Sequence, residues 1–568
     1  MKNNQLTNTL KQIAQLSKGM EVDLDQNGNL RSLTTNNTGG LQNSCSLASA
    51  WLSPNKVQQK SNNSFDEQPV DGVDAFYIAN EFINQPIIKE HLQSANIELD
   101  LTDITPFAFG YRISFRQISA YPQKNMLLPV YGGSMHMAMN KLGEIFSLTS
   151  TLQYEKANSK QEALISETEA IKLASASCQY KTASAAARLV LLAHNGMLEP
   201  AYEVKVVCVH PSKNYICLVL ANTGIVIDQR PRTLYYHRSK ISDLVKARAL
   251  LKTPDPNKPI PQQISKAVIE RLPNPQVLRD RYLNMLTGKT KDVVYAKPDG
   301  TYCYQSNYVE FAAVSVFISL VKQLALYLQS GMVEPGKQQL TVVVNDSSVK
   351  DNAYFDPQHY EIHLGVGTGV DRGGLTKHIA YDLGVANHEF GHVIAYWQTV
   401  AGDLAGRQGI ALNEAVGDVL GTLVMDYLAR IWYADQFGQQ LTKVDLQKDA
   451  RVIGTYALPP FGIRTQKNGR TTPNDLTGEP HGDGLIVGGA LADLLIAMAT
   501  EPDKSIEDQI KLFVKLSLMA MALLPGYKVM FSDMLRAMIT ADQQISDGQY
   551  RPMIEKFFHR HGIVLNAE

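Results

Sequence analysis

The segment GVANHEFGHVIAYW places two histidines and an acid in the spacing H-E-x-x-H, as His388, Glu389 and His392. Residues four apart on an α-helix lie on one face about one turn apart, so both imidazoles can bind the same metal ion. Glu389 projects beside that face, where its carboxylate can act as a general base toward a water molecule. The chain has 13 histidines, and a motif this short also fits an ordinary buried helix. A metal site therefore requires a third ligand elsewhere in the sequence.

A catalytic zinc ion has three protein ligands and one open position, so a carboxylate on a second helix is expected. The segment IALNEAVGDVLGTLVMDYL predicts that helix. We interpret Asn413 as its N-cap, which places Glu414 in the first turn and Asp418 one turn later on the same face. Glu414 is the candidate third ligand, and Asp418 can fix the tautomer of a ligating imidazole by accepting its other N–H. Alternatively, Glu414 is an exposed acid that stabilises the helix N-terminus. The predicted buried stripe consists of Val416, Val419, Leu420, Leu423 and Val424.

The combination of H-E-x-x-H with N-E-x-x-x-D, in which Glu414 follows His392 by twenty-two residues, resembles the thermolysin-like and fungalysin-like zinc metallopeptidases. The resemblance implies an α+β fold, with a mixed α/β pro-region followed by a bilobal catalytic unit of the gluzincin type. Its first lobe would be strand-rich and its second lobe helical. The implied cofactor is one Zn²⁺ held by His388, His392 and Glu414, with Glu389 as catalytic base and Asp418 as the partner of His388. The implied activity is a zinc-dependent endopeptidase that hydrolyses peptide bonds and is made as a zymogen.

A histidine in the glycine-rich segment GEPHGDGLIVGGALADLL is a second catalytic candidate. Peptide hydrolysis develops negative charge on the carbonyl oxygen, so a hydrogen-bond donor should face that oxygen. His481 resembles the histidine of the H-G-x-G segment in fungalysin-like enzymes and is predicted to be this donor. Asp475, Glu479 or Asp483 could orient its ring. Alternatively, His481 is a solvated loop side chain.

Two further segments resemble substrate-binding elements of these families. N-A-Y-F, with Asn352, Ala353 and Tyr354, resembles the N-A-F-W edge strand, which binds the substrate backbone by strand addition. In LPPFGIRTQKNG, Arg464 resembles the arginine of the G-I-R phrase, and an arginine of these enzymes bonds a substrate carbonyl. The alternatives are an ordinary hairpin edge and a surface arginine. The four residues are therefore candidate substrate contacts.

The chain departs from the family pattern in two places. The families carry a tyrosine between the second histidine and the third ligand that assists the oxyanion. Here Tyr396 is the only tyrosine in that interval, and it is too close to His392. The dense acidic calcium-binding stretch after the third ligand is replaced by MDYLARIWYADQFG. A second oxyanion donor is therefore not assigned, and Ca²⁺ is possible but has no clear motif.

Composition changes divide the chain into segments of different character. A polar N-terminal segment contains one patterned piece, MEVDLDQNGNLRSL, which predicts a hairpin. LPVYGGSMHMAMNKLGEI predicts another, turning near Asn140 to Gly143, and resembles an FTP-type propeptide module of these families. SETEAIKLASASCQ predicts a capped helix and LEPAYEVKVVCV a strand, which together resemble their PepSY-type module. By this resemblance, residues 1–230 form an inhibitory and folding-assisting pro-region. The predicted segments are 1–64 polar, 65–150 FTP-like, 151–230 PepSY-like, 231–290 proline-rich linker, 291–384 strand-rich catalytic lobe and 385–568 helical catalytic lobe.

The charge balance and apolar segments limit the expected partners and location. With 54 basic and 55 acidic side chains, the net charge is −1, so no overall field favours nucleic acid or an anionic membrane. FAAVSVFISLVKQLALYL is interrupted by Lys322 and Gln323 and predicts a buried helix instead of a membrane span. The N-terminus contains no secretory signal pattern, whereas the resemblance implies secretion, so cytoplasmic location or another export route stays open. The expected partners are a protein or peptide substrate and the chain's own pro-region.

The five cysteines are an odd number without a C-x-x-C pair, so we interpret them as buried or free thiols. Cys208 and Cys217 flank VHPSKNYI, which predicts strand-turn-strand. A disulfide across that hairpin is the alternative.

Two other functions are compatible with these residues. An aminopeptidase or another zinc hydrolase would need a group that binds a free substrate amine, and no such motif is found. A non-catalytic binding protein would keep the pro-region in the cleft permanently, and the missing tyrosine favours that alternative.

Overall fold

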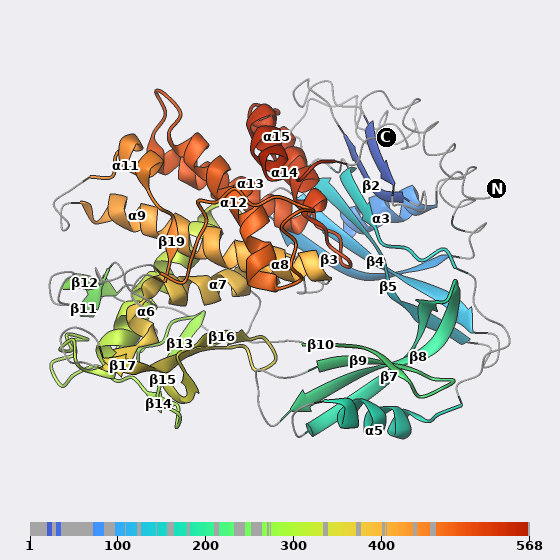
Figure 1. Ribbon diagram of the computed structural model, residues 1–568, viewed down its shortest axis with the longest axis horizontal. Helices are drawn as coiled ribbons and strands as arrows, with labels where there is room; N and C mark the ends of the chain where they lie inside the picture. The colour runs from blue at the N-terminus through green and yellow to red at the C-terminus, as the bar shows by residue number, and fades with distance from the viewer. Residues whose placement is uncertain are drawn as a thin grey trace.

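The computed structural model belongs to the α+β class, with 40% helix and 31% strand. We call residues 20–231 the N-terminal half and residues 245–565 the C-terminal half. Strands dominate the N-terminal half, and long helices follow a smaller sheet in the C-terminal half (Figure 1). The structure describes residues 20–24, 30–35, 72–84, 92, 97–107, 110–121, 126–141, 143, 145–155, 164–178, 182–208, 215–231, 245–251, 264–269, 272, 274–332, 339–370, 376–399, 404, 406–434, 440–454 and 462–565.

The N-terminal half is built on one 10-stranded sheet. Its main path runs β1-β2-β6-β5-β7-β8-β9-β10, while β4 pairs with β5 and β3 pairs with β4. Helix α3 (Gly72–Ile83) packs on the first group of strands and helix α5 (Glu167–Ser177) on the second. The two groups meet where Val130 of β5 pairs with Leu191 of β7. The strands are β1 (Met20–Leu24), β2 (Leu30–Thr35), β3 (Glu98–Phe107), β4 (Gly110–Tyr121), β5 (Met126–Asn140), β6 (Ile145–Ser150), β7 (Thr182–His194), β8 (Met197–Cys208), β9 (Tyr215–Leu220) and β10 (Val226–Pro231).

Local sequence signals in this half are confirmed. The predicted β5–β6 hairpin turns where the Gly143 N–H donates to the Asn140 carbonyl at 3.1 Å. Ser166 caps α5 by accepting a hydrogen bond from the Glu169 N–H at 3.2 Å. The predicted N-terminal hairpin is present as β1 and β2, and β2 also pairs with β6. These strands therefore belong to the sheet of the first module, although they precede its predicted boundary.

The cysteines of this half do not form the alternative disulfide. Strands β8 and β9 are antiparallel, but Cys217 pairs with Val204 and not with Cys208. Burial raises the pKa of the Cys217 thiol to about 12. Cys45 lies outside the described residues. Among the described residues the free thiols are Cys178, Cys208, Cys217 and Cys303, two of them buried, which confirms the interpretation as free or buried thiols.

Part of the segment predicted as a linker is in regular structure. Strands β11 (Val245–Leu250) and β12 (Ile264–Ile269) pair along their whole length as an antiparallel ribbon. Ala249 and Leu250 are fully buried against the core of the C-terminal half, and the Leu250 N–H donates to Ser315 Oγ of helix α6 at 2.8 Å. Alternating small and apolar residues are therefore a stronger signal here than the surrounding prolines.

After the β11–β12 ribbon, the C-terminal half forms a six-stranded sheet in the order β14-β13-β15-β17-β16, with β18 also paired to β17. Strands β13, β15 and β17 are parallel, and β16 is an antiparallel edge strand. Helix α6 (Val309–Gln329) packs against β13 and β15 and against the helices that follow. The strands are β13 (Leu283–Thr287), β14 (Asp292–Val293), β15 (Leu340–Lys350), β16 (Ala353–Asp356), β17 (Glu361–Val370) and β18 (Thr376–His378).

Helices make up most of the remaining chain and share one hydrophobic core with α6 and the sheet. The apolar positions predicted as a buried stripe, from Val416 to Val424, are all buried in this core. The elements are η4 (Ile379–Tyr381), α7 (Leu383–Gln398), α8 (Arg407–Val416), the π-helix η6 (Gly417–Leu423), α9 (Val424–Trp432), α11 (Lys443–Lys448), β19 (Val452–Ile453), β20 (Arg464–Thr465), α12 (Pro480–Ala499), α13 (Ile506–Ala522), α14 (Phe531–Ser546) and α15 (Arg551–Arg560).

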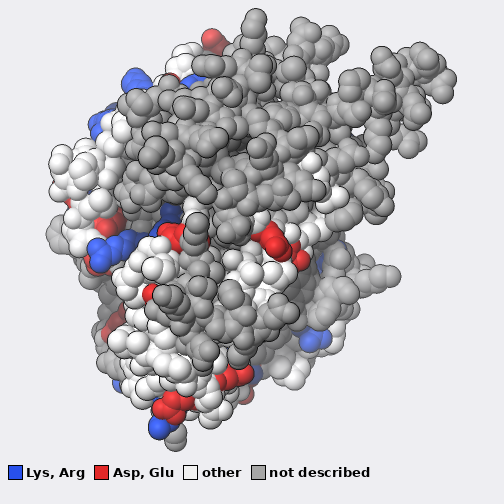
Figure 2. All heavy atoms as spheres, turned by 90° about the vertical axis from the view of Figure 1, so that its right-hand side faces the viewer, with Lys and Arg blue, Asp and Glu red and all other residues white. Residues whose placement is uncertain are grey.

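Helices α6 and α12 are long and apolar enough to cross a membrane by length and composition alone. Their apolar windows are 72% and 78% buried inside the fold, as core helices commonly are. The segment FAAVSVFISLVKQLALYL is thus the buried helix that the sequence predicts. On the molecular face in Figure 2, the described residues include both acidic and basic side chains, in line with the small net charge.

Candidate metal centre

Helix α7 carries the two histidines of the H-E-x-x-H motif. It begins at Leu383 because the Asp382 side chain accepts a hydrogen bond from the Val385 N–H at 3.3 Å, a cap that contributes about 1 kcal/mol. The rings of His388 and His392 lie 4.6 Å apart between centroids and are nearly perpendicular, at 85°. Both imidazoles therefore leave the same face of the helix, as their spacing predicts.

Glycines let the π-helix η6 approach α7 closely. A Cβ on Gly417 would lie 2.7 Å from the His388 ring, and a Cβ on Gly421 would lie 2.5 Å from the Asn387 carbonyl oxygen. Gly391 on α7 is equally close to Gly417, at 2.7 Å. Because real Cβ atoms do not approach so closely, larger residues at these positions would push the helices apart. The glycines thus bring the carboxylates of the second helix within reach of the imidazoles.

The second helix begins earlier than the sequence predicts. Helix α8 starts at Arg407 after Gly406, whose φ of 96° ends the preceding loop, so Asn413 is inside the helix and is not its N-cap. The Asn413 Oδ1 instead lies 3.2 Å from Nδ1 of His392. Gly417 then begins a π-helical turn that contains Asp418, a distortion frequent at functional sites. The N-cap interpretation is wrong because Asn413 faces a side-chain partner on α7.

Glu414 completes a group of residues that could bind a metal ion. One ligand atom from each of His388, His392 and Glu414 lies within 4.8 Å of the other two. The closest approaches are 3.4 Å from His388 Nε2 to Glu414 Oε2 and 3.8 Å from His392 Nε2 to Glu414 Oε1. Glu414 Oε2 is buried and makes no hydrogen bond of good geometry within the described structure. A two-histidine, one-carboxylate donor set with this spacing fits a divalent cation such as zinc.

The Nδ1 atoms of both histidines face residues that set ring orientation. His388 Nδ1 lies 2.9 Å from Asp418 Oδ1, and His392 Nδ1 lies 3.2 Å from Asn413 Oδ1. These contacts leave both Nε2 atoms directed toward Glu414. A metal site gains affinity when the non-ligating nitrogen of each imidazole is held in this way.

Arg464 joins the site through Asp418. Its guanidinium makes a paired contact with the Asp418 carboxylate, at 2.6 Å from Nε and 2.7 Å from Nη2. Nη2 also lies 3.5 Å from the His388 ring nitrogens and 3.6 Å from Glu414 Oε2. Arg464 is therefore not an isolated surface arginine. It belongs to the charged cluster around the candidate ligands.

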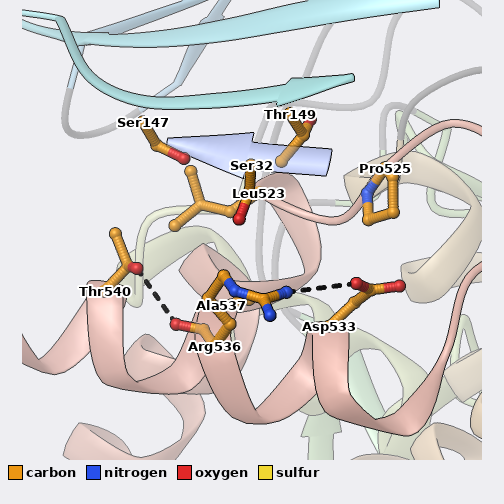
Figure 3. A pocket seen from close by; sticks show the side chains of 9 residues that line it. All are labelled: Ser32, Ser147, Thr149, Leu523, Pro525, Asp533, Arg536, Ala537 and Thr540. Atoms are coloured by element: carbon orange, nitrogen blue, oxygen red, sulfur yellow. Dashed lines mark hydrogen bonds and ion pairs between the residues drawn. The ribbon is translucent and has the colours of Figure 1, made fainter. Parts of the chain in front are cut away.

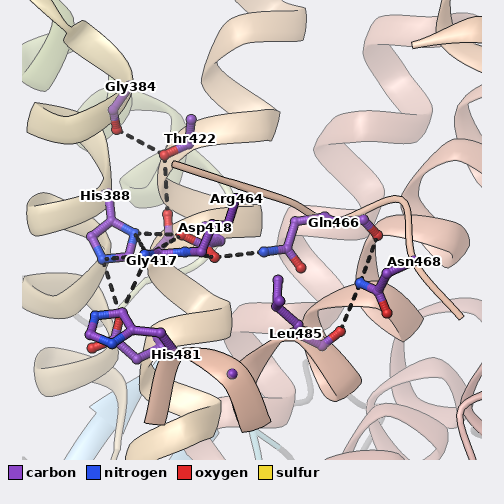
Figure 4. A network of polar contacts seen from close by, with 12 residues as sticks. Gly384, His388, Gly417, Asp418, Thr422, Arg464, Gln466, Asn468, His481 and Leu485 are labelled. Carbon is purple, nitrogen blue, oxygen red and sulfur yellow. Dashed lines mark hydrogen bonds and ion pairs between the residues drawn. The ribbon is translucent and has the colours of Figure 1, made fainter. Parts of the chain in front are cut away.

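Gln466 is a residue of this cluster that sequence reasoning missed. It is fully buried, and its Nε2 donates to Asp418 Oδ2 at 2.6 Å. Figure 4 shows Gln466 and His388 approaching Asp418 from opposite sides. Gly488 of α12 provides the space, since a Cβ there would lie 2.3 Å from Gln466 Oε1. The sequence spacing could have predicted this residue. Gln466 follows Arg464 by two residues in a strand-like segment, and such residues share a face.

The charged partners shift the pKa values of the buried groups in opposite directions. Burial alone would lower the pKa of His388, but hydrogen bonds and charges from Asp418 and Glu414 outweigh burial and raise it to about 10. Burial opposes ionisation of Glu414, yet His392, His388 and His481 hold its pKa well below the usual range. His388 and Arg464 likewise overcome burial and lower the pKa of Asp418. The cluster therefore holds both carboxylates ionised, and ionised carboxylates can bind a cation.

His481 lies beside the candidate ligands in the first turn of α12. Its Nε2 is 3.2 Å from Glu414 Oε2, and its Nδ1 is 2.7 Å from Glu479 Oε1. Of the three acids that could orient the ring, Glu479 makes this contact, and it also caps α12 through the N–H groups of His481 and Gly482. Asp483 instead accepts from the Thr477 and Gly478 N–H groups. The His481 side chain is 52% exposed, so it can reach a bound molecule.

The predicted substrate-binding strand is an edge strand of the C-terminal sheet. Ala353 and Tyr354 belong to β16, which pairs only with β17 in the described structure, and Asn352 precedes it. The Tyr354 ring stacks on His363 of β17 at 4.8 Å. Among the described residues, no strand pairs with the other side of β16. These residues are not part of the charged cluster around Glu414.

No protein-family model matches the chain. No curated protein matches it either. Among solved structures, part of the chain is similar to the Bacillus megaterium YpeB C-terminal domain. That similarity has 16% sequence identity and a TM-score of 0.19, and it covers 30% of this chain and 69% of that domain. A score this low supports no statement about shared fold or activity.

Proposed function

We propose that the chain is a zinc-dependent endopeptidase of the thermolysin-like kind, with a bilobal catalytic unit formed by the C-terminal half. The observation that carries the proposal is the close grouping of His388, His392 and Glu414, whose ligand atoms lie within 4.8 Å of one another. This grouping has Glu389 beside it on α7, and His388 and Glu389 are each 6% exposed. Two imidazoles, one carboxylate and an adjacent acid are the set that metal-assisted peptide hydrolysis needs.

Zinc, when bound, polarises the scissile carbonyl and lowers the pKa of a nearby water molecule. Glu389 takes a proton from the attacking water and passes it to the leaving nitrogen. Glu479 holds the Nδ1 atom of His481. In its charged form, the imidazole donates from Nε2 to the substrate carbonyl oxygen, on which negative charge develops. Arg464 holds Asp418 and is close enough to the ligands to contact a substrate carbonyl. The side of β16 that does not face β17 would pair with the substrate backbone.

A non-catalytic binding protein is a second candidate because the chain has no tyrosine in the place of the family tyrosine that donates to the oxyanion. Tyr396 is 5% exposed, and its ring packs edge-on against Phe355 at 6.0 Å between centroids. In this position Tyr396 belongs to the core and does not serve the oxyanion. A chain in which His481 cannot replace that donor would bind peptides without cleaving them.

Casein hydrolysis by the purified full chain, before and after limited proteolysis between the halves, separates these candidates. The active protein should contain about one zinc ion per chain by elemental analysis. Glu389→Gln should retain the zinc and lose turnover by about a hundredfold to ten-thousandfold, since an amide cannot accept the proton. Turnover equal to wild type in this variant would exclude Glu389 as the base. A wild-type protein that binds zinc but never cleaves casein would favour the binding protein.

We further propose that the N-terminal half is the pro-region of this enzyme. Two modules precede the candidate catalytic unit, and they form a separate sheet with its own helices. Parallel pairing of β13, β15 and β17 joins segments distant in sequence, and such pairing raises the entropic barrier to folding. A template that binds the C-terminal half would lower this barrier.

A further inference from the structure

A buried arginine links the N-terminal sheet to the end of the metal-site helix. Arg112 of β4 donates from Nη1 to the carbonyl oxygen of Gln398 at 2.7 Å. Gln398 is the last residue of α7 and is 1% exposed, while Arg112 is 8% exposed. The last carbonyls of a helix lack partners within it, and its C-terminal end carries partial negative charge. Arg112 therefore supplies both the hydrogen bond and the positive charge that this helix end requires.

A second contact fixes the sheet against the connection between α13 and α14. The Tyr131 ring meets the Tyr527 ring edge-on, with centroids 6.0 Å apart. Gly132 makes this possible, because a Cβ there would lie 2.8 Å from the Tyr527 ring and its φ is +73°. The Y-G-G sequence of β5 therefore contacts the C-terminal half and is also part of the hairpin.

Polar side chains from both halves line a pocket between the sheet and α14. Figure 3 shows Ser32, Ser147 and Thr149 of the sheet facing Arg536 and Thr540 of α14. Ala138 and Phe146 of the N-terminal half are buried in the same hydrophobic core as the C-terminal helices. The two halves therefore share part of one hydrophobic core in addition to these polar contacts.

We infer that the N-terminal sheet supports the C-terminal half at the last residue of the metal-site helix α7. Arg112 is the positioning residue that holds this helix end. The partner is this chain's own β4–β6 unit, and the contact persists after the backbone between the halves is cut. Gln398 follows His392 by six residues, or about 9 Å along the helix. The support is therefore delivered along α7, from its last residue toward the candidate ligands. This inference deepens the proposed pro-region role and rests on it.

The test uses the full chain, with a site-specific protease sequence replacing residues 235–240. After cutting, the two fragments of the wild type should co-elute in gel filtration. Arg112→Gln removes the charge and replaces the guanidinium that donates to the Gln398 carbonyl with a shorter amide, so the dissociation constant of the fragments should rise at least tenfold. Arg116→Gln is the matched control, because Arg116 lies on the same strand but pairs with Asp100 of β3 at 2.5 Å. It should behave as wild type.

Hydrogen exchange in the uncut chain shows whether Arg112 acts through α7. In Arg112→Gln, the amides of the last turn of α7 should exchange at least tenfold faster, while those of β15 and β17 should not change. Arg112→Lys should restore part of the protection, because an ammonium group can donate to the same carbonyl. If Arg112→Gln does not fold while Arg112→Lys and Arg116→Gln do, the positioning role is supported.

Equal fragment retention and equal α7 exchange in Arg112→Gln and Arg116→Gln would overturn the inference, as would separation of the wild-type fragments. These readouts do not depend on peptidase activity. Fragments that stay together in a protein without zinc or turnover would contradict the proposed function alone. Fragments that separate from an active enzyme would contradict this inference alone.

Discussion

His136 in the N-terminal sheet and His388 in the candidate metal centre are both buried, yet they have opposite protonation behaviour. His136 has a pKa lowered to about 3, because burial disfavours its charge and Arg112 adds repulsion. His388 has a pKa raised to about 10, because Asp418 and Glu414 outweigh the same burial. Depth therefore does not decide the charge of a buried imidazole. The sign of the groups facing the ring decides it.

A third buried histidine shows what further distinguishes a candidate ligand. His363 of β17 has Asp346 Oδ2 2.7 Å from Nδ1 and Glu361 Oε2 3.0 Å from Nε2. Both ring nitrogens are thus used within the protein. His388 has Nδ1 on Asp418 and directs Nε2 to the group around Glu414. A carboxylate beside a histidine is common to both sites, whereas only His388 has a nitrogen among converging ligand atoms.

The sharpest test of this contrast substitutes the two histidines in turn. His388→Gln should abolish zinc binding, reducing the zinc content from about one ion per chain to near zero, because two remaining ligands cannot complete the site. His363→Gln is the matched control and should keep the zinc. Elemental analysis after dialysis measures both. Retention of zinc by His388→Gln, or its loss from a folded His363→Gln, would break the distinction.

Substituting the carboxylates that contact Nδ1 of the two histidines should change zinc affinity less than substituting the histidines. Asp418→Asn should weaken zinc binding by about tenfold to a hundredfold, because the partner that orients His388 loses its charge. Asp346→Asn faces His363 and should leave zinc affinity unchanged. Competition with a fluorescent chelator gives both affinities. Equal losses in the two variants would mean that Asp418 acts through general stability and not through His388.

The raised pKa of His388 predicts that protons compete with zinc. In the metal-free protein His388 stays protonated up to a pH of about 10, so zinc must displace that proton. The apparent zinc affinity should rise by up to about tenfold per pH unit between pH 7 and 9. Without zinc, the stability from the protonated ring is complete below pH 6.5 and is lost as pH rises toward 10. A flat affinity over this range would contradict the assignment of His388 as a ligand.

His136 predicts the opposite dependence in the N-terminal half. Its folded pKa of about 3 is below the unfolded value of 6.5, so its contribution is complete above pH 6.5 and is lost as pH falls toward 3. Between neutral pH and pH 5.5 the free energy of unfolding should fall by about 1 kcal/mol from this group. Denaturant unfolding of wild type and His136→Gln across this range measures the difference. An identical decline in both proteins would exclude His136 as its source.

Local signals made parts of the fold predictable. Ser166 and the Asn140 to Gly143 turn each act within a few residues, so the α5 cap and the β5–β6 hairpin follow from sequence. The start of α8 was missed because Asn413 has the residue type of a cap but is used by His392 instead. Strands β11 and β12 were not predicted within the proline-rich region, because their burial depends on contact with α6.

The sequence by itself determined that His388 and His392 share a face, because helical geometry makes that relation local. It also determined which carboxylates were candidates, since acids near a second helix are few. Only the tertiary structure decided that Glu414 reaches both imidazoles, that Glu479 orients His481, and that Asp418 is shared with Arg464 and Gln466. It also decided that Arg112 meets Gln398, a contact across 286 residues. The physical reason is that such contacts depend on how close helices pack, and spacing along one helix carries no information about its distance to another.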